Sequence, residues 1–149
     1  MEFDPNNNIV KLCAKGMEME GKCQPEEASK LFLEAWEEAT NNFEKFTAAH
    51  YVARHQKSPA DKLKWDETSL QLALKINNDK VKGTFPSLYL NIAKCYEDLD
   101  DPGNAKRNYE LALSFSSLLP DDGYGKLIKG GIINGISKIP KSMRIEHIK

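Results

Sequence analysis

The residues best suited to chemistry lie together in one short segment, residues 50–56. Two histidines, a tyrosine, an arginine and a glutamine fall there within about two turns of an expected helix, a combination that can bind a ligand, move a proton or hydrogen-bond a neighbouring helix. Tyr51 and His55 are four residues apart and therefore share one helical face, with Arg54 beside it. His50 falls on the apolar stripe instead. We expect His50 to be buried and hydrogen-bonded, and Tyr51 and His55 to face a ligand.

Metal binding and catalysis are less well supported by the same segment. A helical zinc pair places histidines at i and i+4, whereas His50 and His55 are five apart and splayed. No serine or cysteine stands at a recognisable nucleophile turn, so only acid–base chemistry by His55 stays open. The glycines at 123 and 125 lack the third glycine of a phosphate loop and follow no expected strand. We predict no catalytic residue, no metal site and no cofactor.

A side-chain pattern that occurs three times indicates which elements position this segment. From Trp36 to Leu74 to Leu113 the spacings are 38 and 39 residues, a period typical of stacked helix pairs. Each copy sets small residues beside large apolar ones on one helical face, so a neighbouring helix can approach closely. The copies comprise Ala28, Phe32, Ala35 and Trp36; Leu70, Ala73 and Leu74; and Ala105, Tyr109, Ala112 and Leu113.

Proline and capping residues divide the chain into expected helices. Pro25, Pro59 and Pro102 stand where helices can begin, and turn-rich asparagines separate the pairs. The expected helices span residues 8–22, 25–40, 42–57, 59–77, 86–99, 102–118 and 122–138. This predicts an N-terminal tail at 1–7, a repeat domain at 8–139 with helix pairs at 8–40, 42–77 and 86–118 and a capping helix at 122–138, and a basic tail at 140–149.

The third helix pair resembles the tetratricopeptide repeat family almost position for position, through Tyr89, Ile92, Ala93, Tyr96, Ala105, Tyr109 and Ala112. The first pair matches through Gly16, Ala28, Phe32 and Ala35. The second departs from the pattern, with Arg54 and Asp66 where small residues are usual. The resemblance covers about residues 8–118 and implies an all-α solenoid of about three helix pairs, in which the first helix of each pair lines a concave groove.

The resemblance implies a scaffold that binds a peptide or protein partner in this groove. Its expected lining is Cys13, Met17, Tyr51, Arg54, His55, Leu90, Asn91 and Lys94. The alternative is a small-molecule sensor or enzyme that uses residues 50–56. The chain also looks like small stand-alone bacterial members of the family sometimes labelled rRNA adenine methyltransferases, although no glycine-rich turn after a strand supports that label. A chaperone-binding clamp is disfavoured because Cys13, Met17, Ser87 and Asn91 replace its basic and amide residues.

Composition narrows the partner class. A net charge of -1 gives little gain from counterion release, so neither nucleic acid nor an anionic membrane is an expected partner. An acidic start and the absence of a long apolar run favour a soluble, cytoplasmic protein. Cys13, Cys23 and Cys95 show no paired spacing and are expected to be buried, reduced thiols.

Two further features are expected to serve packing. Gly130, Gly131 and Gly135 interrupt the capping helix, and each costs roughly 1 kcal/mol relative to alanine, which close approach to helix 102–118 would offset. Trp36 and Trp65 lie at helical spacing and are expected to fill the core.

Overall fold

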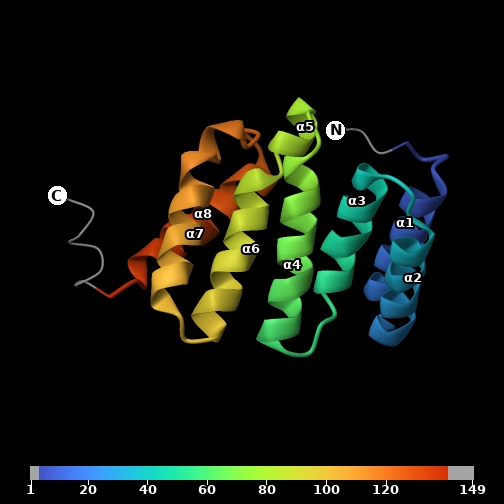
Figure 1. Cartoon of the computed structure of the whole chain (residues 1–149), viewed down its shortest axis with the longest axis horizontal. Helices are drawn as coiled ribbons and strands as arrows, with labels where there is room; N and C mark the ends of the chain where they lie inside the picture. The colour runs from blue at the N-terminus through green and yellow to red at the C-terminus, as the bar shows by residue number, and fades with distance from the viewer. Residues whose placement is uncertain (1–3, 141–149) are drawn as a thin grey trace. The chain divides into compact units, whose positions relative to one another are not determined.

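A computed structural model describes residues 4–140 of the chain, and these residues form helices without any strand. The α-helices are α1 (Asn8–Gly21), α2 (Pro25–Glu38), α3 (Asn42–Ala53), α4 (Pro59–Leu74), α5 (Asp79–Lys82), α6 (Phe85–Asp98), α7 (Pro102–Ser114) and α8 (Gly123–Ser137), with a 3-10 helix, η1 (Ser116–Leu118), after α7 (Figure 1). The all-α class is confirmed. Residues 141–149 of the expected basic tail, and residues 1–3 of the N-terminal tail, lie outside the described residues.

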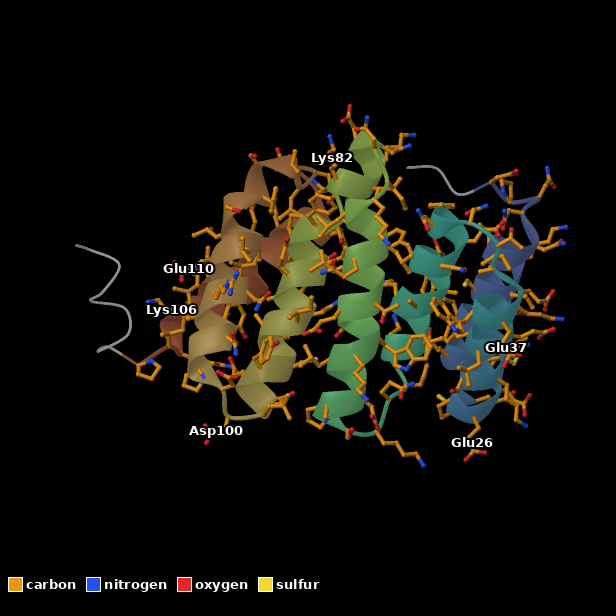
Figure 2. The ribbon with its side chains drawn as sticks, in the orientation of Figure 1. Glu26, Glu37, Lys82, Asp100, Lys106 and Glu110 are labelled. Atoms are coloured by element: carbon orange, nitrogen blue, oxygen red, sulfur yellow. The ribbon has the colours of Figure 1, made fainter. Side chains whose placement is uncertain are left out.

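The chain divides between Val81 and Lys82 into two compact units. The N-terminal unit contains α1 to α4 and the C-terminal unit contains α6 to α8, with the short α5 at the division. Charged side chains point away from the core of each unit: Figure 2 shows Glu26 and Glu37 on α2, and Lys106 and Glu110 on α7.

Five of the seven predicted helix starts are confirmed, and the other two, at residues 86 and 122, lie one residue from the observed starts at Phe85 and Gly123. These starts depend on local signals. Pro25, Pro59 and Pro102 all stand at the first helical position. Side chains before the helices accept hydrogen bonds from otherwise unpaired backbone N–H groups, and these caps are Asn7, Asn41, Ser58, Asp101 and Asp122.

Helix ends differ more from expectation, and α3 differs most. The expected helix 42–57 ends at Ala53, because the N–H groups of residues 54–56 bond to carbonyls three residues back instead of four. Ser58 then takes an extended conformation with ψ 148°, as a residue before proline must. His55 therefore lies in a turn after α3 and not within the helix. The four-residue α5 was not predicted, and α4 and α7 end at Leu74 and Ser114.

The turns inside the first and third helix pairs have the same geometry, 77 residues apart. Cys23 and Asp100 adopt positive φ values of 60° and 57°, the only non-glycine residues to do so among those described. Each is followed by a helix cap with nearly equal angles, φ -116° and ψ 70° at Gln24 and φ -117° and ψ 78° at Asp101. The N–H of Gln24 donates to the carbonyl of residue 19 and that of Asp101 to residue 96, both at 2.9 Å.

The three cysteines differ in exposure. Cys23 is exposed, contrary to the prediction for this thiol, whereas Cys13 and Cys95 are buried as predicted.

An aromatic ring lies at the centre of each unit, and a glycine allows a helix to approach it. In the N-terminal unit, a Cβ atom added at Gly16 of α1 would lie 2.3 Å from the ring of Phe32 on α2. In the C-terminal unit, a Cβ atom at Gly135 of α8 would lie 2.1 Å from the ring of Tyr109 on α7. The predicted close packing of the capping helix is therefore confirmed at Gly135. Gly130 has nothing within 4 Å and makes no such approach.

Candidate functional site

The predicted chemical segment is built on the ring of Phe32, which is completely buried. Tyr51 stacks on this ring with centroids 5.1 Å apart and an interplanar angle of 18°. His55 stacks on it as well, at 5.7 Å and 23°. The prediction that Tyr51 and His55 share a face is confirmed, and on that face both rings pack against the core. They are held by stacking before any ligand binds.

Glu20, in the last turn of α1, fixes the polar atoms of the same cluster. Its Oε2 lies 2.7 Å from Nε2 of His55, and its Oε1 accepts a 3.0 Å hydrogen bond from Nη1 of Arg54. The Arg54 guanidinium also lies over the Tyr51 ring, 4.7 Å from its centroid. One carboxylate thus ties the end of α3 to the end of α1. We name Glu20, Tyr51, Arg54 and His55 the Glu20 cluster.

Sequence reasoning missed Glu20, because nothing local to it marks a site. A carboxylate on an expected solvent-facing helix position is an ordinary surface residue, and its partners are 34 and 35 residues further along the chain. The available signal was the internal repeat: Glu97 stands 77 residues after Glu20 and also accepts a hydrogen bond, from the hydroxyl of Tyr109 on the next helix.

The remaining predicted groove residues of the N-terminal unit differ in exposure. Cys13 is 2% exposed, and burial raises the pKa of its thiol to about 12, so it stays protonated and belongs to the core. Met17 is 40% exposed on α1, one helical turn before the Glu20 cluster. Burial also raises the pKa of Tyr51, and the Arg54 charge opposes this rise. Of the predicted lining in the N-terminal unit, Met17 and Arg54 are the side chains most accessible to a partner.

Leu90, Asn91 and Lys94 lie on α6 in the C-terminal unit, so the structure describes them separately from the Glu20 cluster. Leu90 is 3% exposed and packs in the core with Tyr109 and Ile132. Asn91 is half-buried and Lys94 is exposed. Lys94 is therefore the accessible member of this group.

His50 is half-buried, not fully buried as predicted, and its covered Nδ1 atom has no hydrogen-bond partner among the described residues. The expectation of a fully hydrogen-bonded histidine was therefore wrong for this atom. Burial lowers the pKa of His50 to about 4, and the charges of Arg54 and Lys62 lower it further in the same direction. The imidazole is neutral at pH 7.

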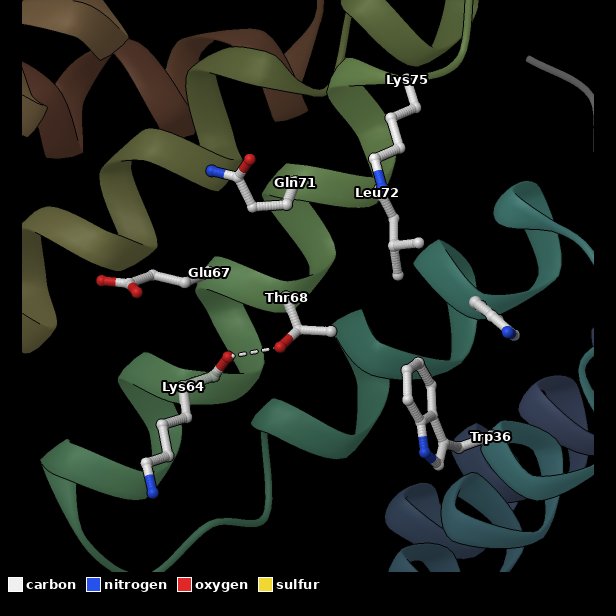
Figure 3. A pocket seen from close by; sticks show the side chains of 8 residues that line it. Trp36, Lys64, Glu67, Thr68, Gln71, Leu72 and Lys75 are labelled. Carbon is white, nitrogen blue, oxygen red and sulfur yellow. Dashed lines mark hydrogen bonds between the residues drawn. The ribbon is translucent and has the colours of Figure 1, made fainter.

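A cleft of about 610 Å³ lies elsewhere on the N-terminal unit and was not predicted. Figure 3 shows Thr68 and Leu72 of α4 on the side of that helix where Trp36 of α2 lies. Three lysines and a single carboxylate complete its lining, which comprises Trp36, Lys45, Lys64, Glu67, Thr68, Gln71, Leu72 and Lys75. We name it the α2–α4 cleft.

The packing role predicted for the two tryptophans is confirmed, and Trp36 has a second position as well. Trp36 and Trp65 meet edge to face, with centroids 5.1 Å apart and an interplanar angle of 87°. Both are partly buried against the core around Phe32. Because Trp36 also lines the α2–α4 cleft, one face of the indole is supported and another borders open space.

Within residues 4–140, no three histidine, cysteine or acidic side chains gather closely enough to hold a metal ion. The same part of the chain contains no helix with the length and apolar character needed to cross a membrane. Comparisons of the chain with protein-family models, curated proteins and solved structures found no match.

Proposed function

We propose that the chain is a helical repeat scaffold of the tetratricopeptide type that binds a segment of another protein. The observation that carries this proposal is the repeated construction of α1/α2 and α6/α7, which have the same turn and the same hydrogen bonds at an offset of 77 residues. That offset is two periods of the 38- and 39-residue pattern. Helix pairs repeated in this way build extended binding surfaces in solenoid proteins.

The helix that follows each of these pairs is also attached in the same way. In the N-terminal unit, Arg54 at the end of α3 pairs with Glu20. In the C-terminal unit, Lys138 at the end of α8 pairs with Glu97, the equivalent acid, at 3.8 Å. This supports α8 as the first helix of an unfinished pair, the role of a capping helix. The middle pair departs from the pattern at Asp66, which is buried and accepts a 2.8 Å hydrogen bond from Lys62.

In each unit we propose a binding surface of its own, made of accessible side chains on or directly after the first helix of a pair. In the N-terminal unit these are Met17 and Arg54, beside Tyr51; in the C-terminal unit it is Lys94, beside the half-buried Asn91. Stacking and the Glu20 pair hold Tyr51 and Arg54 in place before binding. A surface ordered in advance loses less side-chain entropy when a partner binds, which favours affinity.

The enzyme or sensor alternative receives less support from the same geometry. Nε2 of His55 and Nη1 of Arg54, two of the polar atoms that could act on a substrate, are already bound by Glu20. No strand followed by a glycine-rich turn exists in residues 4–140 to hold a methyl donor. An interaction surface therefore accounts better for the arrangement.

The test is capture of partners by the full chain, followed by cross-linking to locate the contact. Met17→Glu introduces a charge at the proposed surface without touching the core and should weaken capture at least tenfold, with the melting temperature unchanged. Lys30→Glu, an exposed change on α2, is the matched control and should capture normally. Equal capture by both variants, or retention of a small molecule in place of a protein, would contradict the proposal.

A further inference from the structure

We propose that the α2–α4 cleft binds an acidic polypeptide segment that carries an apolar side chain at its centre. The site is separate from the surface proposed above, because neither Met17 nor any member of the Glu20 cluster lines it. It does not depend on the tetratricopeptide assignment. The charge of the cleft, the indole of Trp36 and the spacing of the lysines indicate this ligand.

Charge gives the class of ligand. Lys45, Lys64 and Lys75 line the cleft, and Glu67 is its only acid. None of the ion pairs formed within residues 4–140 includes any of these three lysines. Elsewhere on the same unit, three lysines pair with an acid one helical turn away: Lys22 with Glu18, Lys30 with Glu27 and Lys62 with Asp66. A concave surface with an unbalanced positive charge attracts an anionic partner.

The centre of the cleft is apolar. Trp36 is fixed edge to face against Trp65, and Leu72 on α4 lies on the side that faces it (Figure 3). The hydroxyl of Thr68 donates to the carbonyl of Lys64 at 2.8 Å, and this bond fixes the orientation of the hydroxyl group. An apolar side chain that enters between Trp36 and Leu72 would remove both from water. A supported aromatic ring is a common anchor in protein interfaces.

The positions of the lysines give the length of the ligand. Lys64 and Lys75 are eleven residues apart, which is roughly 16 Å along a helix at 1.5 Å per residue. An extended peptide covers that span in about five residues. The matching segment thus has acidic residues about five positions apart and a large apolar residue between them. Gln71, on the same helix, also lines the cleft.

The same features favour a polypeptide over a phosphate or nucleic acid. The lysines are distributed along the cleft and do not converge on one point, as a phosphate would require. The lining contains no arginine, which is the side chain best suited to bidentate phosphate contacts. The chain as a whole has a net charge of -1, which gives no general attraction to nucleic acid.

The experiment measures fluorescence polarisation of labelled peptides with the full chain. The probe has two acidic residues at each end and a phenylalanine in the middle. The two acidic ends lie about five positions apart. We expect saturable binding that weakens as salt is raised. A peptide of the same composition with all acids at one end should bind at least fivefold more weakly. A single-stranded oligonucleotide and inorganic triphosphate should bind more weakly than the probe.

Two variants locate the binding. Lys64→Glu with Lys75→Glu should weaken probe affinity at least tenfold, and Leu72→Gln should weaken it about threefold to tenfold with little change in salt dependence. Lys15→Glu with Lys57→Glu makes the same change in net charge away from the cleft and should alter affinity less than twofold. Circular dichroism verifies that each variant is folded.

Any of several results would overturn the proposal. These are no saturable binding of the probe, equal binding of the rearranged peptide, equal loss in both double-charge variants, or tighter binding of the oligonucleotide or triphosphate. Met17→Glu distinguishes the cleft proposal from the proposed function. It should leave probe binding unchanged even if it abolishes partner capture.

Discussion

The two units use one design around different rings. In the N-terminal unit, Phe32 of α2 is covered by Tyr51 and His55 from α3. In the C-terminal unit, Tyr109 of α7 is covered by the bare backbone of Gly135 on α8. The first arrangement brings polar and aromatic groups to the surface, whereas the second brings a helix as close as possible. The third helix, which follows the pair, can therefore either bring polar and aromatic side chains to the surface or cover the core.

The equivalent acids show the same contrast. Glu20 binds two side chains from the end of α3, and one of them is an arginine stacked on Tyr51. Glu97 accepts a 2.9 Å hydrogen bond from the hydroxyl of Tyr109 within its own helix pair, and its link to Lys138 is long. The acid holds a binding surface together in one unit and satisfies a buried hydroxyl in the other.

Removal of α8 should have the largest effect, because it uncovers the core of the C-terminal unit. Ile132 and Ile139 are almost fully buried, and two such side chains contribute about 3–6 kcal/mol. Truncation after Pro120 should lower the melting temperature of this unit and promote association, measured by calorimetry and light scattering. Truncation after Pro140 is the control and should change little. A Pro120 truncation that stays monomeric with an unchanged melting temperature would remove the closing role of α8.

Low pH should destabilise the N-terminal unit, because that unit contains His50. Its pKa is about 4 when folded and 6.5 when unfolded, so the unfolded chain binds more protons between these values. The contribution to stability is complete above about pH 6.5 and is lost as the pH falls toward 4, by up to about 3 kcal/mol. Urea unfolding at several pH values checks this. His50→Gln should flatten the dependence over that range, and an unchanged slope in the variant would contradict the assignment.

The glycines of α8 give a smaller and more local test. In Gly135→Ala the new methyl group meets the Tyr109 ring, whose hydroxyl is fixed by Glu97, and we expect a loss of about 1–3 kcal/mol. Gly130→Ala is the matched control, with nothing within 4 Å, and should stabilise the helix by roughly 0.5–1 kcal/mol. Thermal unfolding measures both. If the two substitutions changed stability in the same direction, the close approach at Tyr109 would not be the constraint.

Helix starts and the repeat could be predicted from sequence because their signals are local or periodic. Proline at the first position and an acceptor before it act within one turn, and the alanine and aromatic spacing fixes which face packs. The end of α3 could not be placed as well, since it depends on how residues 54–56 reach Pro59. The approach of Gly135 to helix 102–118 was predictable, yet the ring that it meets was not.

The binding features were harder to predict because they depend on distance in space. Glu20 and His55 are far apart in sequence, and only the fold brings them to 2.7 Å. The α2–α4 cleft combines lysines that suggest a solvated surface with a tryptophan that suggests a core. Of the predicted groove residues, Cys13 and Leu90 are buried in the core and are not accessible to a partner. Spacing fixes the face of a helix, whereas depth depends on the neighbouring helix.

The smallest predicted effect compares the two equivalent acids directly. Glu20→Gln keeps one acceptor but loses the charge that binds both Arg54 and His55, and partial exposure of the pair limits the cost to about 1 kcal/mol. Glu97→Gln keeps a carbonyl acceptor for the Tyr109 hydroxyl and loses only an exposed, long ion pair, so its cost should be within about 0.5 kcal/mol. Urea unfolding at low and high salt separates them, since the difference depends on charge and should shrink as salt is raised. Equal costs for the two substitutions would mean that Glu20 does no more for its unit than Glu97, and the polar cluster on Phe32 would then be held by ring stacking alone.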